Sequence, residues 1–574
     1  MLINGPADVA GAALDGLTRT ADGVSRLAGS TATAIRSDVA EARAAGLVAV
    51  VSGGGAGHDP AHAGYVGSGM LTAAVTGALF TPPPPDAVLD AIRAAAAPAG
   101  ALLVVPNRPA DRLSFALAAE MARADGIDVV VVPVGDDVSR TGEGRRGLAG
   151  TVLVQKVAGA AAAGGRPLAQ VAALARRAAS AVGTMGVALG PCTATVAGVP
   201  LSGSELDSPL ELGSHQGLGF APGEVEWGPG ASGEPGVGRG PIGSAYQVAA
   251  RLIAAIVEDR GIVPGDRVAL LVNGLGASSP TELSIMAEGA VRALRSWGVT
   301  PVRVWAGDFL TTLDMAGVSL SLLPVDDELV AALDAPTTAP AWPHTTAPAE
   351  PGLVKAPPGI STAPGELGLD HPVRLVLEAV AEALISVRDE LTALDREAGD
   401  GDLGVSLALG AAAVLAECPA YPGADGPAAV LRAAADTVRR TVAGVSGPLY
   451  AILLLRAAAA LPDSPGPRDW AAALRAGLDG VREAAGAEPG DRTMIDALAP
   501  AAATFADRLD AGHPWPEALN AAVDAATTGA DATVDLEPRL GRAGYLGVRV
   551  LGYPDPGAQA VAIWLRAAAT ALHP

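Results

Sequence analysis

The chain has 574 residues, about three to four times the size of a typical domain, so more than one hydrophobic core is expected. Half of the residues are hydrophobic and 17% are charged, which excludes a chain that is disordered throughout. The net charge of −22 and the aromatic content of 3% argue against nucleic acids and anionic membranes as partners.

Short β-branched runs alternate with helical patterns over the first part of the chain. This alternation is typical of an α/β sheet covered by helices, so we predict an α/β substrate-binding region, with two α/β lobes, over residues 1–334. Strands are expected at residues 47–51, 101–105, 129–134 and 268–272, and a helix is expected at residues 113–123.

Residues 335–364 are rich in Pro, Thr and Ala, a composition that favours extended backbone and predicts a linker. Ala-rich amphipathic segments dominate the remaining sequence, so we predict an all-helical domain over residues 365–574. Its helices are expected at residues 372–394, 427–442, 470–485, 494–509 and 516–527.

A glycine-rich segment, SGGGAGHDPAH at residues 52–62, directly follows the first expected strand. Glycines let backbone N–H groups approach a ligand closely, and α/β sheets bind ligands at the carboxyl ends of their strands. His58 would supply a titratable donor at that edge. A flexible turn with a surface histidine explains the same residues equally well.

Asp111 follows the strand expected at residues 101–105. Its carboxylate could accept the proton of a substrate hydroxyl, or it could cap the helix that is expected to begin near Leu113. The spacing alone favours the cap.

An acidic turn in the C-terminal region, LDREAGDGDLG at residues 394–404, is the sharpest chemical signal. Asp395, Asp400 and Asp402 are separated by glycines, so their carboxylates can turn toward one hard cation or a pair of cations, and Mg²⁺ prefers oxygen ligands of this kind. A calcium-binding EF-hand loop is excluded, because Gly404 and Ala411 occupy positions that need oxygen ligands. An Asp/Gly-rich turn between helices is the structural alternative.

Several glycine turns in the same region could bind phosphate. Ser446 and Gly447 could open a helix whose free N–H groups face an anion, and further turns occur at residues 490–496, 541–547 and 554–558. Lysine occurs only at Lys156 and Lys355, and neither is followed by Ser or Thr, so a Walker-type phosphate loop is absent from the sequence. Metal ions and helix N-termini at one end of a helical bundle are therefore the expected means of holding a nucleotide.

The two cysteines, Cys192 and Cys418, lie far apart and form no metal-ligand motif. A reduced, cytoplasmic compartment fits this pattern. The sequence around Met1 lacks the charged and apolar regions of a signal peptide, and no uninterrupted apolar run of membrane length is apparent, so we expect no membrane partner.

These motifs together resemble the single-chain, ATP-dependent dihydroxyacetone (glycerone) kinase family over nearly the whole sequence. The matching N-terminal segments lie at residues 52–77, 111–137, 146–162 and 233–239. The matching C-terminal segments lie at residues 394–404, 446–450, 489–498, 541–547 and 554–558.

The resemblance implies a ketone-binding α/β domain followed by an α-helical barrel that holds ATP and two Mg²⁺ ions. Asp395, Asp400 and Asp402 would be the magnesium ligands, and Asp111 and His58 would handle the proton of the phosphorylated hydroxyl. Substrate contacts would come from Gly55, Ala56, Gly57, His58, Asp111 and the residue at position 232. The implied nucleotide-binding residues are Leu403, Gly404, Val405, Ser406, Ser446, Gly447, Gly486, Thr493, Met494, Arg542, Asp555, Pro556 and Gly557.

Two positions depart from the family pattern. The family anchors its ketone covalently, as a hemiaminal on a histidine, and this position is Ser232 here. A hydroxyl cannot form a hemiaminal, so a substrate would be bound noncovalently. The family's substrate-contacting lysine is Pro106 here, and Arg108 could supply a substitute charge.

We therefore expect an ATP-dependent kinase, a cytoplasmic homodimer, that phosphorylates a hydroxyl of dihydroxyacetone or a related small ketose or polyol in carbohydrate metabolism. Phosphoryl transfer needs positioning and charge neutralisation more than covalent chemistry, so the retained aspartates support this reading. Three alternatives remain open: a divergent kinase of a specialised metabolite, an FMN-cyclase-type lyase, and a module that senses a metabolite without turnover.

Overall fold

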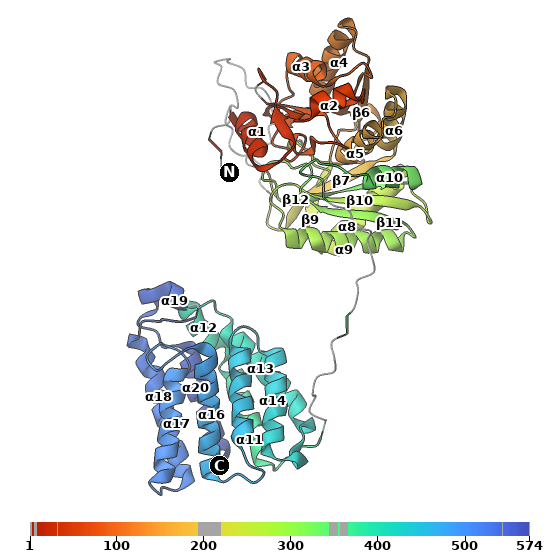
Figure 1. Ribbon diagram of the computed structural model, residues 1–574. Coiled ribbons are helices and arrows are strands. Elements are labelled where there is room, and N and C mark those ends of the chain that lie inside the picture. The colour runs from red at the N-terminus through yellow and green to blue at the C-terminus, as the bar shows by residue number, and fades with distance from the viewer. Residues whose placement is uncertain are drawn as a thin grey trace. The chain divides into compact units, whose positions relative to one another are not determined.

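The computed structural model describes residues 3–4, 8–30, 32–192, 220–343, 354–355, 365–541 and 543–572. The chain divides into two compact units, residues 1–353 and 354–574 (Figure 1). The first unit is mixed α/β, and the second is helical, in agreement with the fold class expected from the sequence.

The first sheet of the N-terminal unit has the strand order β1-β2-β4-β3-β5-β6. Strands β3, β4, β5 and β6 pair in parallel, whereas β1, β2 and β4 pair antiparallel. All residues of β5 are buried, as expected for a strand inside a parallel sheet. The strands are β1 (Val24–Arg26), β2 (Thr33–Arg36), β3 (Ala49–Ala56), β4 (Ala73–Leu79), β5 (Ala101–Pro106) and β6 (Val129–Val134).

The second sheet has the order β11-β10-β12-β7-β8-β9 and is mixed, since only β10 and β11 pair in parallel. It brings together strands that are far apart in the sequence, because β7 pairs with β12. The strands are β7 (Gly183–Ala188), β8 (Glu224–Trp227), β9 (Gly238–Pro241), β10 (Arg267–Gly274), β11 (Thr300–Gly307) and β12 (Gly317–Pro324).

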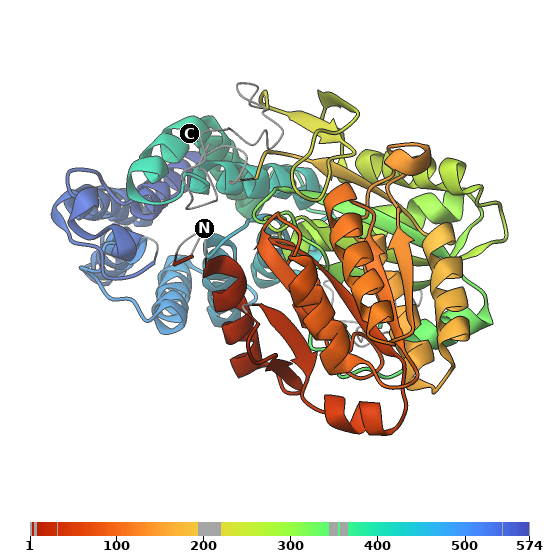
Figure 2. The same cartoon turned by 90° about the horizontal axis from the view of Figure 1, so that it is seen from above.

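Helices cover both sheets and separate them (Figure 1). Helices α5 and α6 contact strands of both sheets, α3 and α4 pack on the outer face of the first sheet, and α8 and α9 pack on the second. The view from above shows α3 and α4, in orange, in front of the strands they cover (Figure 2). The helices are α1 (Val9–Thr20), α2 (Val39–Ala44), α3 (Pro85–Ala95), α4 (Pro109–Ala124), α5 (Gly150–Ala163), α6 (Leu168–Ala181), α8 (Ala245–Arg260), α9 (Pro280–Ser296) and α10 (Asp327–Asp334).

The C-terminal unit consists of helices joined by short connections. The segment expected as one helix at residues 372–394 forms two, which meet at Val387. Helices α13, α19 and α20 were not predicted, and α15 begins at Ser446, where the sequence allowed a helix to open. The helices are α11 (Pro372–Ser386), α12 (Arg388–Ala398), α13 (Leu403–Glu417), α14 (Pro427–Thr441), α15 (Ser446–Ala460), α16 (Pro467–Ala485), α17 (Ile495–Asp510), α18 (Trp515–Ala532), α19 (Ala543–Leu546) and α20 (Pro556–Leu572).

Within this unit, helices that are consecutive in the sequence pack against each other, and the last helix packs against the first. Each long helix contacts the next in the order α11, α13, α14, α15, α16, α17, α18, α20, and α20 contacts α11 again. Successive long helices run in opposite directions, and α13, α15, α17 and α20 all begin at the same end of the unit (Figure 1). Within the described residues, one segment, Leu403–Ala420, is long and apolar enough by composition to span a membrane, and its helix α13 packs against α11, α12 and α14.

Candidate active site

Residues 52–56 of the glycine-rich segment form the end of strand β3, and residues 57–62 follow as a turn in which His58 is buried, not the surface histidine that the sequence also allowed. Gly55 lies against the main chain of the segment after β4, where an added Cβ atom would come within 2.6 Å of the backbone nitrogen of Thr81. Gly57 has φ +94°, a conformation that favours glycine, and its carbonyl accepts a hydrogen bond of 2.8 Å from Leu313 N. These glycines are therefore required by close backbone packing, which in turn places His58.

His58 is buried and holds one defined tautomer. Its Nε2 lies 2.9 Å from Nη1 of Arg108, and its Nδ1 lies 3.0 Å from the carbonyl oxygen of Thr311. A guanidinium group only donates, so Nε2 must accept, and Nδ1 must carry the proton that it donates to the carbonyl. Burial and the charge of Arg108 hold the pKa of His58 well below its usual value. The imidazole is neutral, with its lone pair already engaged.

Arg108 also contacts Ser232, and so joins two segments that lie far apart in the sequence. Its Nη1 donates to Oγ of Ser232 over 3.2 Å. Ser232 N in turn donates a hydrogen bond of 2.8 Å to a carboxylate oxygen of Glu234. The structure thus brings the three predicted residues His58, Arg108 and Ser232 together.

Asp111 lies in the first turn of α4 but does not cap it, so the interpretation that the spacing favoured is wrong. The side chain is only 3% exposed, and Oδ1 accepts no hydrogen bond. Burial raises the pKa of Asp111 to about 6, with Arg108 opposing this rise and Glu234 adding to it. A buried carboxylate with a vacant oxygen and a raised pKa has the properties of a general base.

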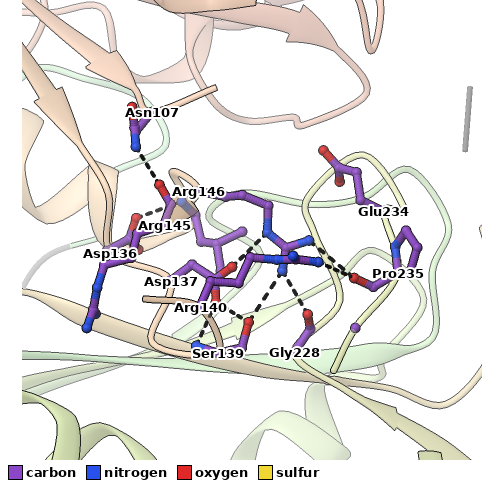
Figure 3. A network of polar contacts seen from close by, with 12 residues as sticks. Asn107, Asp136, Asp137, Ser139, Arg140, Arg145, Arg146, Gly228, Glu234 and Pro235 are labelled. Atoms are coloured by element: carbon purple, nitrogen blue, oxygen red, sulfur yellow. Dashed lines mark hydrogen bonds and ion pairs between the residues drawn. The ribbon is translucent and has the colours of Figure 1, made fainter. Parts of the chain in front are cut away.

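The segment that carries Ser232 is held at both ends by Arg146, a residue that the sequence did not single out (Figure 3). Arg146 Nη2 donates to the carbonyl oxygen of Gly228 over 2.8 Å, and Nη1 donates to that of Pro235 over 3.4 Å. Its Nε forms a 2.7 Å ion pair with the buried Asp137. These bonds fix the main chain on either side of Ser232.

Asn107 links the same segment to the Arg108 side of the site. Its Nδ2 donates to the carbonyl oxygen of Arg145 over 2.5 Å, directly before Arg146 in the sequence (Figure 3). The two halves of the site, residues 107–111 and 228–235, are therefore held by one hydrogen-bonded network.

In the C-terminal unit, the predicted metal ligands converge. One carboxylate oxygen each from Asp395, Asp400 and Asp402 lies within 4.8 Å of the others. Asp395 is buried and also accepts a hydrogen bond of 3.0 Å from Leu403 N at the start of α13, whereas Asp400 and Asp402 are exposed. Such an all-carboxylate oxygen set, open to solvent on one side, fits magnesium with phosphate oxygens and water as further ligands.

The starts of α13 and α15 are packed closely beside these aspartates. Ser406 Oγ donates to the carbonyl of Ala443 over 3.2 Å and accepts from Ala443 N over 2.7 Å. At Gly404 an added Cβ atom would overlap the carbonyl oxygen of Arg388, and at Gly447 it would overlap that of Val442. The predicted residues Leu403, Gly404, Val405, Ser406, Ser446 and Gly447 thus lie at two adjoining helix N-termini.

The starts of α17 and α20 form a second pair. An added Cβ atom at Gly557 would lie 3.7 Å from Met494 N, which shows that these two turns are in contact. Asp555 caps α20 by accepting a 2.8 Å hydrogen bond from Ala558 N, and burial raises the pKa of Asp555 to about 6. Asp496 accepts a hydrogen bond of 2.7 Å from Thr493 N. Gly486 ends α16 in the left-handed conformation, at the same end of the unit.

Arg492 organises this second pair and was missed by the sequence interpretation. The side chain is buried, and it donates hydrogen bonds to the carbonyl oxygens of Thr533, Val550 and Tyr553. It therefore anchors the connection between α18 and α20. The predicted nucleotide residue Arg542 lies outside the described residues.

Two family models match the chain, at residues 15–341 for the Dak1 domain and at residues 397–570 for the DAK2 domain. A putative 3,4-dihydroxy-2-butanone kinase of Solanum lycopersicum is 40% identical over 598 residues, which cover 100% of this chain and 98% of the relative. The triokinase/FMN cyclase of Bos taurus is 39% identical over 588 residues, 99% of this chain and 97% of the relative. The crystal structure of the dihydroxyacetone kinase from C. freundii with AMP-PNP and Mg²⁺ matches with a TM-score of 0.68 and 32% identity, covering 99% of both chains.

Proposed function

The chain belongs to the dihydroxyacetone kinase family, with its Dak1 and DAK2 domains on one polypeptide, and from this membership we propose that it transfers the γ-phosphoryl group of ATP to a hydroxyl of a small ketose, polyol or related compound. The convergence of Asp395, Asp400 and Asp402 at the starts of the helices is the observation that carries the proposal. These carboxylates would hold Mg²⁺, which when bound supplies the charge neutralisation on which phosphoryl transfer depends.

Asp111 acts as the general base. Its buried carboxylate has a vacant oxygen and a pKa of about 6, so it is ionised at neutral pH and can accept the proton of the substrate hydroxyl. His58 has no vacant lone pair in this arrangement, because Nε2 accepts from Arg108. His58 therefore positions the guanidinium group and keeps it beside Ser232.

Acceptor binding is noncovalent in this proposal. The hydroxyl of Ser232 stands where a hemiaminal would need a nucleophilic nitrogen, and it already accepts a hydrogen bond from Arg108. Gly55, Ala56 and Gly57 shape the floor of the site through their main chain, since their positions are fixed by the packing of residues 79–81 and 313.

In the C-terminal unit, Asp395, Asp400 and Asp402 would hold magnesium, which when bound neutralises the phosphate charges of ATP. The N–H groups at the starts of α13 and α15 face an anion favourably, because the helix dipole is positive there. The turns at Thr493–Met494 and Asp555–Gly557 would contact the rest of the nucleotide.

We also propose that the C-terminal helices close into a barrel, that the protein is a homodimer, and that it works in the cytoplasm, with two magnesium ions per nucleotide. The return of the packing order from α20 to α11 supports a closed arrangement. The two cysteines are buried and form no disulfide with each other, as in proteins of a reducing compartment. Light scattering on the purified protein tests the dimer, with a monomer mass as the contrary result.

The direct test is acceptor-dependent ADP release from Mg-ATP. A panel of trioses, tetroses, polyols and sugar acids is expected to contain at least one compound that raises ADP release well above the rate without acceptor. ADP release that no acceptor stimulates would instead support a metabolite-sensing module.

A second activity, formation of a cyclic flavin phosphate from a flavin nucleotide, is suggested by the name of the Bos taurus relative, triokinase/FMN cyclase. Incubation with FAD and a divalent cation tests it. Release of AMP together with a flavin product of lower mass supports this activity, and unchanged FAD rejects it.

A further inference from the structure

Arg108 is a half-buried cation whose protein partners are all neutral. Nη1 donates to His58 and Ser232, and among the residues that the structure describes no carboxylate oxygen lies within 4.0 Å of its guanidinium nitrogens. Its neighbours differ, because Arg145 is paired with Asp259 at 2.6 Å and Arg146 is paired with Asp137 at 2.7 Å. Arg108 therefore lacks the close counter-ion that Arg145 and Arg146 have.

The unused donors of Arg108 lie together on one edge. A guanidinium group carries five N–H donors, and the contacts with His58 and Ser232 engage the two on Nη1. Within the described part of the chain, the Nε donor and both Nη2 donors have no protein acceptor. The Nε and Nη2 donors point in parallel, a fork that matches the two oxygens of a carboxylate.

This edge is held in place. Nη1 is fixed by His58, whose other nitrogen is bound to the carbonyl of Thr311, and by Ser232, whose segment is fixed by Arg146. The site therefore offers a pre-oriented fork beside the proposed base Asp111, and binding costs little additional side-chain ordering.

Resting on the proposed kinase function, we propose that the acceptor substrate carries a carboxylate, which the Nε/Nη2 edge of Arg108 binds in bidentate fashion while Asp111 faces the hydroxyl to be phosphorylated. The substrate class is thus small hydroxy acids, three to five carbons long. Arg108 is the residue that determines this specificity.

Charge decides between a carboxylate and the other oxygen groups that could occupy the fork. A neutral carbonyl oxygen would satisfy one or two donors and leave Arg108 without a contacting counter-ion, because Asp111 acts on it only from beyond 4.0 Å. A carboxylate matches both the geometry of the fork and its charge. A phosphate dianion matches the donors as well, but it carries one more negative charge than a carboxylate. Asp111 and Glu234 interact with each other electrostatically, and their carboxylates disfavour that additional charge on the ligand.

Calorimetric titration of the full-length protein without ATP tests the proposal. The probes are matched pairs of three- and four-carbon compounds: D-glycerate against glycerol, hydroxypyruvate against dihydroxyacetone, and erythronate against erythritol. We expect at least one acid to bind about 10 to 100 times more tightly than its neutral partner, the range of a charge-assisted bidentate contact. Equal affinity within every pair, or no binding of any acid, overturns the proposal.

Substitutions of Arg108 test whether its Nε/Nη2 edge causes the preference for acids over their neutral partners. Arg108→Gln is expected to reduce the acid's affinity to that of the neutral partner, and Arg108→Lys, which keeps the charge but not the fork, is expected to recover only part of it. Arg112→Gln is the matched control, because Arg112 is an exposed cation one helical turn further along α4. An equal loss of acid binding in Arg112→Gln and Arg108→Gln would show a general charge effect and would overturn the assignment.

Phosphorylation is measured separately, so that failure of the inference can be distinguished from failure of the kinase function. ADP release with neutral ketoses but with no acid supports the kinase function and rejects the inference. Binding of acids that depends on Arg108, without ADP release from any acceptor, supports the inference and rejects the kinase function.

Discussion

Arg108 and His58 are joined by a hydrogen bond of 2.9 Å between Nη1 and Nε2. Because a guanidinium cannot accept a hydrogen bond, this single contact determines the tautomer and the charge of the histidine. The lone pair of His58, the residue that would ordinarily act as an acid or base here, is therefore occupied by its hydrogen bond from Arg108. The carboxylate of Asp111, one turn along α4, is left as the group that can take up a proton.

The Asp111→Asn variant should lose activity and gain stability. Removing a general base costs about 10² to 10⁴ in kcat. The folded protein binds the Asp111 proton more tightly than the unfolded chain, because burial raises the pKa from 3.8 to about 6, so this residue makes the free energy of unfolding fall as pH rises between those values. At pH 7.5 the amide should therefore raise the free energy of unfolding, by about 1–3 kcal/mol. Chemical denaturation and an ADP-coupled assay measure the two effects.

The pKa of Asp111 also determines how kcat/KM of the wild-type enzyme falls at acidic pH. The base must be ionised, so kcat/KM should rise with pH through about 6 and level off above 7. A pH profile measured at saturating Mg-ATP checks this. A flat profile between pH 5 and 8 would contradict the assignment of Asp111.

Asp400→Asn should abolish Mg-ATP binding while leaving the fold intact. Asp400 is exposed, whereas Asp395 also accepts a hydrogen bond from Leu403 N, so Asp400 is the better position to test the metal. Turnover is expected to fall by more than about 100-fold, since the magnesium that these aspartates would hold neutralises the charge of the transferred phosphoryl group. Calorimetry with Mg-AMP-PNP measures binding. Asp524→Asn, an exposed aspartate on α18, is the control and should bind normally.

Gly404→Ala should destabilise the C-terminal unit and weaken nucleotide binding. Its Cβ atom would overlap the carbonyl oxygen of Arg388 and approach Thr392 N to 2.6 Å, so α12 and α13 must separate. Overpacking of this kind costs about 1–3 kcal/mol. Thermal melting with and without Mg-AMP-PNP measures both effects. Gly368→Ala, which meets no atom within 4 Å, should change neither.

Arg146→Lys should raise KM for the acceptor by about tenfold or more and leave KM for ATP unchanged. A lysine retains the charge beside Asp137 but cannot bind Asp137, Gly228 and Pro235 together, so the segment around Ser232 loses its support. Arg146→Gln should also destabilise the protein, by about 3–5 kcal/mol, because the buried Asp137 then loses its counter-ion and keeps only the hydrogen bonds from Ser139. Arg177→Lys, in exposed ion pairs with Asp326 and Glu328, is the control. An unchanged acceptor KM in Arg146→Lys would show that the network only supports the fold.

Strands β3, β5, β6 and β10 and most C-terminal helices could be predicted from the sequence, because their hydrophobic patterns are local. The other described strands, β4 and β12 among them, were not singled out. The break at Val387 could not be predicted, since residues 372–394 keep a continuous amphipathic pattern across it. Helix α13 was missed, and only the start of α15 was foreseen, because both helices carry apolar residues on nearly every face and show no polar stripe.

The convergence of Asp395, Asp400 and Asp402 followed from their spacing, because a short turn keeps them together. The contact between Arg108 and Ser232 joins segments 124 residues apart and depends on how the second sheet places the segment after β8. The lack of a cap at Asp111 has the same origin, since the tertiary surroundings and not the helix determine where the carboxylate lies.

Arg146 supports the segment around Ser232 through hydrogen bonds to the main-chain carbonyl oxygens of Gly228 and Pro235. This support is indifferent to the identity of the side chain at position 232. A single codon change there can alter acceptor chemistry while the backbone geometry stays fixed, so the N-terminal unit can evolve new acceptor preferences without rebuilding its scaffold.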